Sequence, residues 1–177
     1  MGNLISALVV ATFALGASSA FAETAKFTVN AIDATGVGRK IGSIRLTDTS
    51  GGLTLSPDLK GLPPGEHGFH VHLNPSCEPG PGPNGQTAPG MAAGSHYDPM
   101  SSGKHLGPMN AEGHKGDLPT LVVDNKGNAK KPVVAPRLMV AEVRGHSIMI
   151  HAGGDNSSDQ PLPFGGGGAR IACGVVK

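Results

Sequence analysis

The sequence lacks the features that nucleic acids and membrane surfaces require of a partner. It has no Trp and a single Tyr in 177 residues, and 14 Lys and Arg against 13 Asp and Glu give a net charge of +1. Nucleic-acid binding relies on clustered cations, and single strands also need stacked aromatic rings. The cations are scattered along this chain. We therefore predict no nucleic-acid partner and no anionic membrane surface.

Helical periodicity is missing as well. Short segments that alternate apolar and polar residues recur instead, and the 28 Gly and 15 Pro supply many turns between them. The predicted strands are 25–33, 41–48, 53–60, 67–73, 120–124, 128–134, 146–152 and 169–176. The sequence Asn125-Lys126-Gly127 indicates a hairpin between the fifth strand and the sixth. Eight short strands in one small domain predict an all-β fold, an antiparallel sandwich or barrel.

Two segments are long and rich in Gly, Pro and polar residues, namely 74–118 and 153–168. Structureless loops of such length are uncommon inside a compact domain, and they are usually either functional or disordered. The first loop contains several histidines and an aspartate, which a disordered spacer does not need. We therefore expect two functional loops.

Long apolar runs are absent except at the N-terminus. Leu4 to Leu15 is too short for a membrane span, and it is followed by small residues and by Ala20-Phe21-Ala22. This arrangement predicts a cleaved signal peptide over residues 1–22, although no Lys or Arg precedes the apolar run. The mature chain, 23–177, would be one exported domain without a membrane anchor. The alternative is a buried N-terminal helix.

Cysteine is scarce, with only Cys77 and Cys173. In an exported chain an even pair is first interpreted as a disulfide. The bridge would close a loop of roughly a hundred residues, for which the chain-entropy model gives a stabilisation of about 4–5 kcal/mol.

Histidine, in contrast, is plentiful and placed in a pattern. In GFHVHLNPSC, residues 68–77, His70 and His72 occupy alternate positions of a predicted strand and therefore share one face. Their Cα atoms would lie roughly 6–7 Å apart, which allows two imidazoles to approach one ion. The alternative interpretation is an ordinary polar strand face.

Further candidate ligands extend the pattern. Together they are His70, His72, His96, His105, His114, Asp117 and His151. Imidazole and carboxylate without thiolate suit zinc or copper. His114 and Asp117 stand one tight turn apart, which suits a closed tetrahedral zinc site. Residue chemistry alone does not divide the seven ligands between ions.

Six stretches together carry a family resemblance across most of the predicted mature chain. They are GFHVHLNPSC (68–77), GSHYDP (94–99), GKHLGP (103–108), GHKGDLP (113–119), HAGGDNSSDQP (151–161) and GGGGARIACGVV (165–176). In these stretches, and in their order, the chain resembles the bacterial periplasmic copper/zinc superoxide dismutases. The resemblance implies an eight-stranded Greek-key β-barrel, a periplasmic location, and a monomer or homodimer.

The resemblance also implies the chemistry. Two superoxide anions and two protons would become O₂ and H₂O₂ by one-electron cycling of copper, with one copper and one zinc per subunit. Copper would take His70, His72, His96 and His151, and zinc would take His96, His105, His114 and Asp117. His96 would bridge the ions and help deliver protons, and Arg170 would hold the anion beside copper. Asp155 would hydrogen-bond one ligand of each metal, and Cys77–Cys173 would be the family disulfide.

One departure from the family pattern concerns the steering of superoxide. Bacterial relatives often carry lysine just after the first cysteine, whereas residues 77–90 contain none; Lys104 and Lys115 are candidate substitutes. His67 fits a hydrogen-bonding role near the loop, and His146 is expected to be solvated.

Two other function classes are open to comparison. A non-catalytic metal-binding protein, such as a copper chaperone, would be expected to lose copper ligands or the counterpart of Arg170. Such chaperones also bring a Cys-x-x-Cys domain, which this chain lacks. A zinc hydrolase would need a positioned general base, for which Glu66 and Glu78 are weak candidates.

Overall fold

The computed structural model describes residues 22–177, so the predicted signal peptide falls outside it except for Ala22. The strands are β1 (Thr24–Asp33), β2 (Gly36–Thr49), β3 (Gly52–Lys60), β4 (Gly65–His67), β5 (Phe69–His72), β6 (Gly80–Pro81), β7 (Thr87–Ala88), β8 (Leu121–Val123), β9 (Asn128–Ala129), β10 (Val133–Ala135), β11 (Ser147–His151) and β12 (Arg170–Val175). The helical segments are short: the 3₁₀ turns Met91–Ala93 and Phe164–Gly166, and α1 (Val140–Val143).

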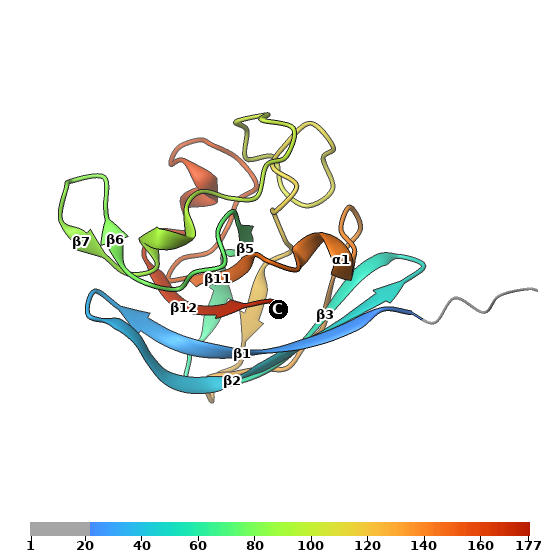
Figure 1. Cartoon of the computed structure of the whole chain (residues 1–177), viewed down its shortest axis with the longest axis horizontal. Helices are drawn as coiled ribbons and strands as arrows, with labels where there is room; N and C mark the ends of the chain where they lie inside the picture. Colours follow the sequence, from blue (N-terminus) through green and yellow to red (C-terminus); the bar gives the residue numbers. More distant parts are fainter. Residues whose placement is uncertain (1–21) are drawn as a thin grey trace, which may run out of the picture.

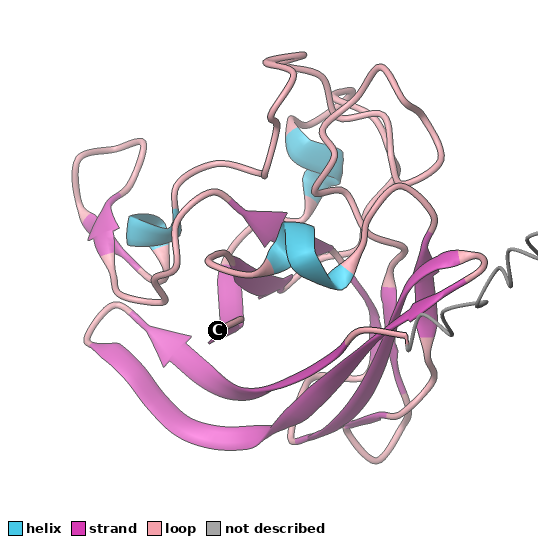
Figure 2. Ribbon diagram, turned by 45° about the vertical axis from the view of Figure 1, so that its right-hand side comes forward, coloured by secondary structure: helices cyan, strands magenta, loops and turns pink. Residues whose placement is uncertain are grey.

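One curled antiparallel sheet forms the body of the molecule, as Figures 1 and 2 show. Its strand order is β10-β3-β2-β1-β12-β11-β5, and β9 joins it by pairing with β3. Two small ribbons, β4 with β8 and β6 with β7, complete the strands. The all-β antiparallel prediction is confirmed.

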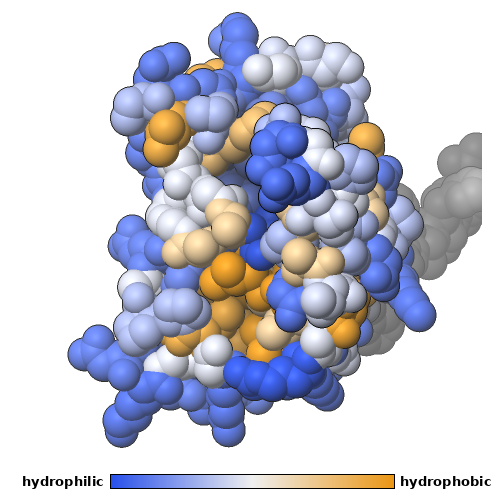
Figure 3. Space-filling view, turned by 90° about the vertical axis from the view of Figure 1, so that its left-hand side faces the viewer, coloured by the Kyte–Doolittle hydropathy of each residue, from blue (hydrophilic) through white to orange (hydrophobic). Residues whose placement is uncertain are grey.

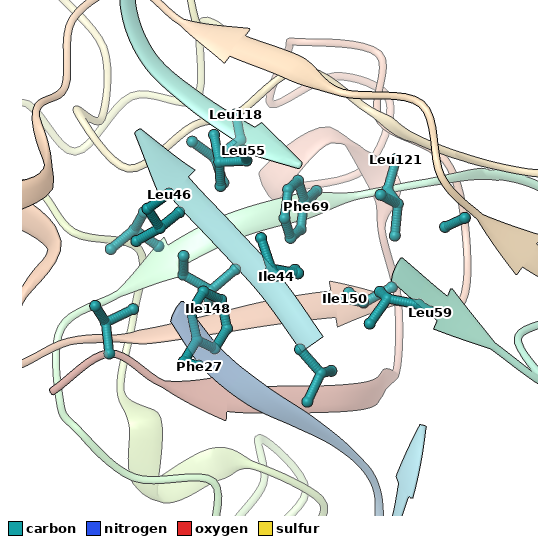
Figure 4. Packing of buried hydrophobic residues seen from close by; sticks show 14 of the residues in the cluster. Phe27, Ile44, Leu46, Leu55, Leu59, Phe69, Leu118, Leu121, Ile148 and Ile150 are labelled. Carbon is teal, nitrogen blue, oxygen red and sulfur yellow. The ribbon is translucent and has the colours of Figure 1, made fainter. Parts of the chain in front are cut away.

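The concave side of the sheet encloses the apolar core. Along β2 and β3 the buried residues alternate, as in Ile44 and Leu46 or Leu53 and Leu55, because alternate side chains share one face. Phe69 meets these residues from β5, and Figure 4 shows its ring among the aliphatic side chains. Burial of this set is the main stabilising contribution to the barrel.

The predicted strand 67–73 is in fact two strands that separate at Gly68. β4 pairs with β8, whereas β5 pairs with β11. Gly68 donates its N–H to Gly153 O at 2.7 Å and accepts from His151 N at 2.9 Å. A Cβ at this position would lie 3.2 Å from the His70 ring, so a larger residue would crowd the ring. The strand therefore changes partners at a glycine beside the histidines.

The hairpin predicted at Asn125-Lys126-Gly127 is present only as a turn, in which Asp124 N donates to Asn128 O and Gly127 N to Asp124 O, each at 2.9 Å. Asp124 accepts hydrogen bonds from Lys126 N and Asn128 N at 2.8 Å each, which closes the turn. The flanking strands then diverge, since β8 pairs with β4 and β9 pairs with β3. Neither β8 nor β9 therefore pairs with the other as a β-ladder.

The two long loops gather on one side of the sheet (Figure 2). The first is fixed along the outer edge of β5. Val71 N donates to Gly116 O at 2.9 Å, and Val71 O accepts from Tyr97 N at 2.8 Å. The loop thereby covers the free edge of β5, and all four residues of the strand are buried. None of the described helices has the length and apolar character needed to cross a membrane.

The predicted disulfide is confirmed. Cys77, at the start of the first loop, is bonded to Cys173 in β12, with Cα atoms 5.6 Å apart across a sequence separation of 96. The bond ties the loop to the centre of the sheet, because β12 lies between β1 and β11.

Candidate metal centre

Three of the candidate ligands come from neighbouring strands. β5 and β11 pair so that His70 faces Met149 and His72 faces Ser147, while His151 ends β11 next to Gly68. The ring centroids of His70 and His72 are 4.9 and 5.8 Å from that of His151. His70 and His72 therefore lie on one face of the strand, as predicted, and form a cluster with His151.

The first loop supplies the other ligands by pairing with β5. Isolated β-bridges set His96 opposite His72 and Asp117 opposite His70. The His96 ring stacks on the His70 ring, with centroids 4.0 Å apart and planes inclined by 26°. The loop histidines thus reach the strand histidines through main-chain register.

Asp117 is the point on which three imidazoles converge. Its Oδ1 atom lies 3.1 Å from Nδ1 of His96, 3.1 Å from Nδ1 of His105 and 3.5 Å from Nδ1 of His114. The Asp117 side chain is completely buried, and Gly107 N donates to its Oδ2 atom at 3.2 Å. Imidazole nitrogens and a carboxylate oxygen are donors that zinc accepts.

Asp155 connects the strand histidines to the loop histidines. Its Oδ2 atom is 2.7 Å from His70 Nε2, and its Oδ1 atom is 2.8 Å from His105 Nε2. A carboxylate only accepts, so these two ring nitrogens carry the protons and leave the Nδ1 atoms free. Carboxylate partners of this kind orient metal-binding imidazoles.

The remaining ring nitrogens show why the residues fit metal ions. Buried atoms that have no hydrogen-bond partner in the described part of the chain are His70 Nδ1, His72 Nε2, His105 Nδ1, His114 Nδ1 and His151 Nε2. A buried polar atom without a partner is destabilising, unless a bound ion satisfies it. His72 and His151 each use Nδ1 on a carbonyl, that of Gly94 at 2.9 Å and that of Gly168 at 3.1 Å, so their Nε2 atoms face inward.

Two groups of ligand atoms emerge, in each of which all atoms lie within 4.8 Å of one another. One is His70, His72, His96 and His151; the other is His70, His96, His105 and Asp117. The first matches the set predicted for copper. The second contains three of the four predicted for zinc, with His70 in place of His114. His114 lies beside this group, with its ring centroid 5.2 Å from that of His96.

Burial sets the protonation of these rings. It holds the pKa of His70 and His72 well below the ordinary value, lowers that of His96, and lowers that of His151 to about 4. His105 is different: burial opposes its charge, but Asp117 and Asp155 prevail and raise its pKa to about 9. The four histidines with a lowered pKa are therefore neutral, as metal ligands must be, whereas His105 carries a proton that a bound cation would displace.

Arg170 stands at the opening of the site. It begins β12 opposite His151, and its guanidinium donates to Gly90 O at 2.6 Å and to Gly94 O at 2.8 Å. Together with His96 and His151 it lines a cavity of about 400 Å³. The disulfide, three residues further along the strand, fixes this part of β12 against the first loop.

Other sequence candidates lie elsewhere. Glu66 and Glu78 are exposed and belong to neither ligand group. Lys115 forms an ion pair with Glu142, which offsets its charge, and Lys104 is exposed. Neither lysine is among the described residues that line the cavity.

The two histidines outside the ligand set have structural roles. His67 is buried, and its ring joins Pro63 O at 2.8 Å to His151 O at 2.7 Å, which confirms the expected hydrogen-bonding role. The expectation that His146 is solvated is wrong. It is partly buried, its Nδ1 is 2.8 Å from Leu73 O, and its ring packs 4.4 Å from that of Tyr97.

Sequence reasoning missed Arg137. Its guanidinium donates to the carbonyls of Pro108 at 3.0 Å and Gly113 at 3.3 Å, and also to His114 O. It therefore holds the turn that carries His114. No motif marks this arginine, because its partners are main-chain atoms of a distant loop.

Comparisons with known proteins agree with this site. The sequence model described as "Copper/zinc superoxide dismutase (SODC)" matches residues 40–176. Superoxide dismutase [Cu-Zn] of Escherichia coli strain K12 is 52% identical over 174 residues, which cover 98% of this chain and 96% of that protein.

Solved structures of copper/zinc superoxide dismutases also match this chain. The Cu/Zn superoxide dismutase from Brucella abortus matches with a TM-score of 0.84 and 46% identity, covering 88% of this chain and all of that chain. The monomeric copper, zinc superoxide dismutase from Salmonella enterica matches with a TM-score of 0.78 and 54% identity over the same shares. The chain therefore belongs to the copper/zinc superoxide dismutase family and is an oxidoreductase that acts on superoxide.

Proposed function

We propose that the chain dismutes superoxide with one copper and one zinc ion held side by side. Copper would be bound by His70, His72, His96 and His151, and zinc by His96, His105, His114 and Asp117. The observation that carries this division is the position of His96, which belongs to both groups of mutually close ligand atoms.

His70 also belongs to both groups, but it cannot serve two ions. Its Nε2 is occupied by Asp155 at 2.7 Å, so only Nδ1 is free. His96 directs Nδ1 toward Asp117, and its Nε2 remains for the group formed with His72 and His151. The hydrogen bonding therefore supports His96 as the shared ligand.

The zinc assignment includes His114 because of its free nitrogen. His114 Nδ1 is buried, has no partner among the described residues, and is 3.5 Å from Asp117 Oδ1. With the Nδ1 atoms of His96 and His105 it completes four protein donors. A site with four protein ligands is closed, which is typical of structural zinc.

Copper, when bound, supplies the one-electron exchange that zinc lacks. The residues of the chain provide the rest. Arg170 is permanently charged and is fixed by two carbonyls, so it can hold the superoxide anion at the opening of the site. His96 lines the same cavity, and its Nε2, when it is not used as a ligand, can take one proton from solvent and pass it to the reduced product. Solvent supplies the second proton, so that two superoxide anions and two protons yield O₂ and H₂O₂.

We further propose that residues 1–22 are a signal peptide and that the mature domain, 23–177, works in the periplasm. The apolar run Leu4–Leu15, followed by Ala20-Phe21-Ala22, supports cleavage after Ala22. The Cys77–Cys173 disulfide supports an oxidising compartment. Mass spectrometry of the protein from a periplasmic fraction tests this: a chain beginning at Glu23 is expected, and a chain retaining residues 1–22 would contradict it.

Metal analysis and dismutation assays test the division of ligands. The mature protein should contain one copper and one zinc, and copper-free protein that retains zinc should be inactive. Returning copper alone should restore activity. Full zinc occupancy with no copper uptake in oxidising buffer would contradict the proposal and favour a zinc-only site.

A further inference from the structure

The cavity beside Arg170 is much larger than superoxide requires. Its volume is about 400 Å³, within the range of pockets that bind small organic molecules, whereas superoxide has two atoms. It lies next to the segment that carries β6 and β7, which projects at one end of the molecule (Figure 1). Figure 3 shows that end face on, with hydrophobic side chains gathered between hydrophilic ones.

Most of the lining is apolar. Three prolines, two alanines, Met91 and Phe164 contribute, together with the edges of His96 and His151. Among the described lining residues, Arg170 carries the one permanent charge.

Phe164 forms a wall of this cavity in an unusual conformation. Its φ is +54°, a value that L residues seldom adopt, and it is 44% exposed. The ring lies against two ligand histidines, with centroids 5.1 Å from His96 and 6.0 Å from His114. The backbone therefore holds an aromatic face at the cavity, although a residue at positive φ is strained.

Arg170 retains donors for a ligand. A guanidinium has five N–H groups, of which Gly90 O and Gly94 O each accept one. The remaining donors suit a carboxylate, which accepts two parallel hydrogen bonds from arginine. One cation beside an apolar wall is complementary to a small anion with an apolar body.

From these observations we infer that the cavity binds small monocarboxylates that carry an aromatic or compact aliphatic group. The carboxylate would contact Arg170, and the apolar body would lie between Phe164 and Met91. This inference rests on the proposed function, because such a ligand occupies the entrance through which superoxide must pass and would compete with it.

Binding of benzoate to copper-free, zinc-loaded protein tests the inference directly, by calorimetry or ligand-observed NMR. Formate supplies the carboxylate without the ring, and benzyl alcohol supplies the ring without the charge. Benzoate should bind at least roughly tenfold more tightly than either probe, because only benzoate uses both parts of the cavity. Equal affinities for benzoate and formate would overturn the inference.

Variants locate the binding. Phe164→Ala should weaken benzoate roughly tenfold and leave formate unchanged, since it removes apolar contact only. Leu162→Ala is the matched control: Leu162 is 59% exposed, two residues away, and outside the lining, so benzoate affinity should not change. If Phe164→Ala loses zinc, Met91→Ala replaces it with the same expected direction. Undiminished benzoate binding in the zinc-retaining variant would overturn the assignment.

The two proposals can fail separately. Across the variants, inhibition of superoxide dismutation by benzoate in the copper-loaded enzyme should be stronger where the copper-free protein binds benzoate more tightly. Loss of dismutation in loaded protein that still binds benzoate would contradict the proposed function only. Full dismutation without any preference for benzoate over formate would contradict this inference only.

Discussion

Asp155 and His105 lie 50 positions apart in the sequence, yet the carboxylate Oδ1 and the ring Nε2 are 2.8 Å apart. The contact joins the second long loop to the first, and the other carboxylate oxygen reaches His70 in β5. One side chain thus fixes a ring from each of the two candidate metal positions, so that both depend on it.

Asp155→Asn should therefore weaken both metals together. An amide has one acceptor oxygen and cannot hold both imidazole N–H groups as the carboxylate does. We expect zinc and copper affinity to fall by roughly 10–100-fold, measured by competition with chelators. Asp58→Asn, at an exposed position of β3, is the control and should change neither. A loss confined to one metal would contradict the linking role.

Gly165→Ala tests how closely the second loop fits around Asp155. Gly165 has φ +72°, and an added Cβ would lie 2.2 Å from Asp155 Oδ1 and 2.8 Å from His105 Nε2. Gly85 is a matched control, because it has φ +77° and open space around the added atom. Both alanines should lower stability by about 1 kcal/mol through backbone strain. Only Gly165→Ala should also release zinc, as followed with a chromogenic chelator; equal metal retention would argue against the contact.

His151→Ala should separate the two metals. His151 belongs to the group assigned to copper and not to the group around Asp117. The variant should lose copper and dismutase activity and keep zinc, which elemental analysis and the activity assay will measure. His146→Ala serves as the comparison, because His146 belongs to neither group and bonds to a main-chain carbonyl; both metals should remain.

Arg170→Ala should slow the reaction without removing metal, because Arg170 contacts carbonyls of the first loop and belongs to neither ligand group. The loss of a fixed cation at the opening should lower the rate constant for superoxide by roughly tenfold or more, as measured by pulse radiolysis. Arg170→Lys should recover part of it, and Arg45→Ala, exposed in β2, should have no effect. An unchanged rate for Arg170→Ala would refute its role.

Removal of the disulfide should destabilise the fold. The bond spans 96 positions, and closure of a loop of this length is worth about 4–5 kcal/mol in the chain-entropy model. Replacing Cys77 and Cys173 by serine should lower the free energy of unfolding by an amount of this order, measured with urea. It should also increase hydrogen exchange at Gly90 and Gly94, whose carbonyls hold Arg170.

Local pattern predicted most of the fold. Alternation of apolar residues located the long strands, because one sheet face is buried along β2 and β3. It could not predict the partner change at Gly68 or the divergence of β8 and β9, since these depend on which distant strand each segment meets.

Residue chemistry predicted which side chains would meet at the site. All seven predicted ligands come together, and the assignment of each to copper or zinc stays a prediction. The proximity of His70 to the Asp117 group and the support of His114 by Arg137 depend on loop packing, so no spacing in the sequence indicated them.

The pairing of β5 with residues 95–97 and 116–118 has a consequence for solubility. A strand at the margin of a sheet offers unpaired N–H and C=O groups to other molecules, which is a common origin of fibrous assembly. Here the segments that present His96 and Asp117 occupy that margin themselves. Anything that keeps these side chains in place also shields the barrel from association through its exposed strand, so cofactor retention and resistance to aggregation rest on the same few backbone hydrogen bonds.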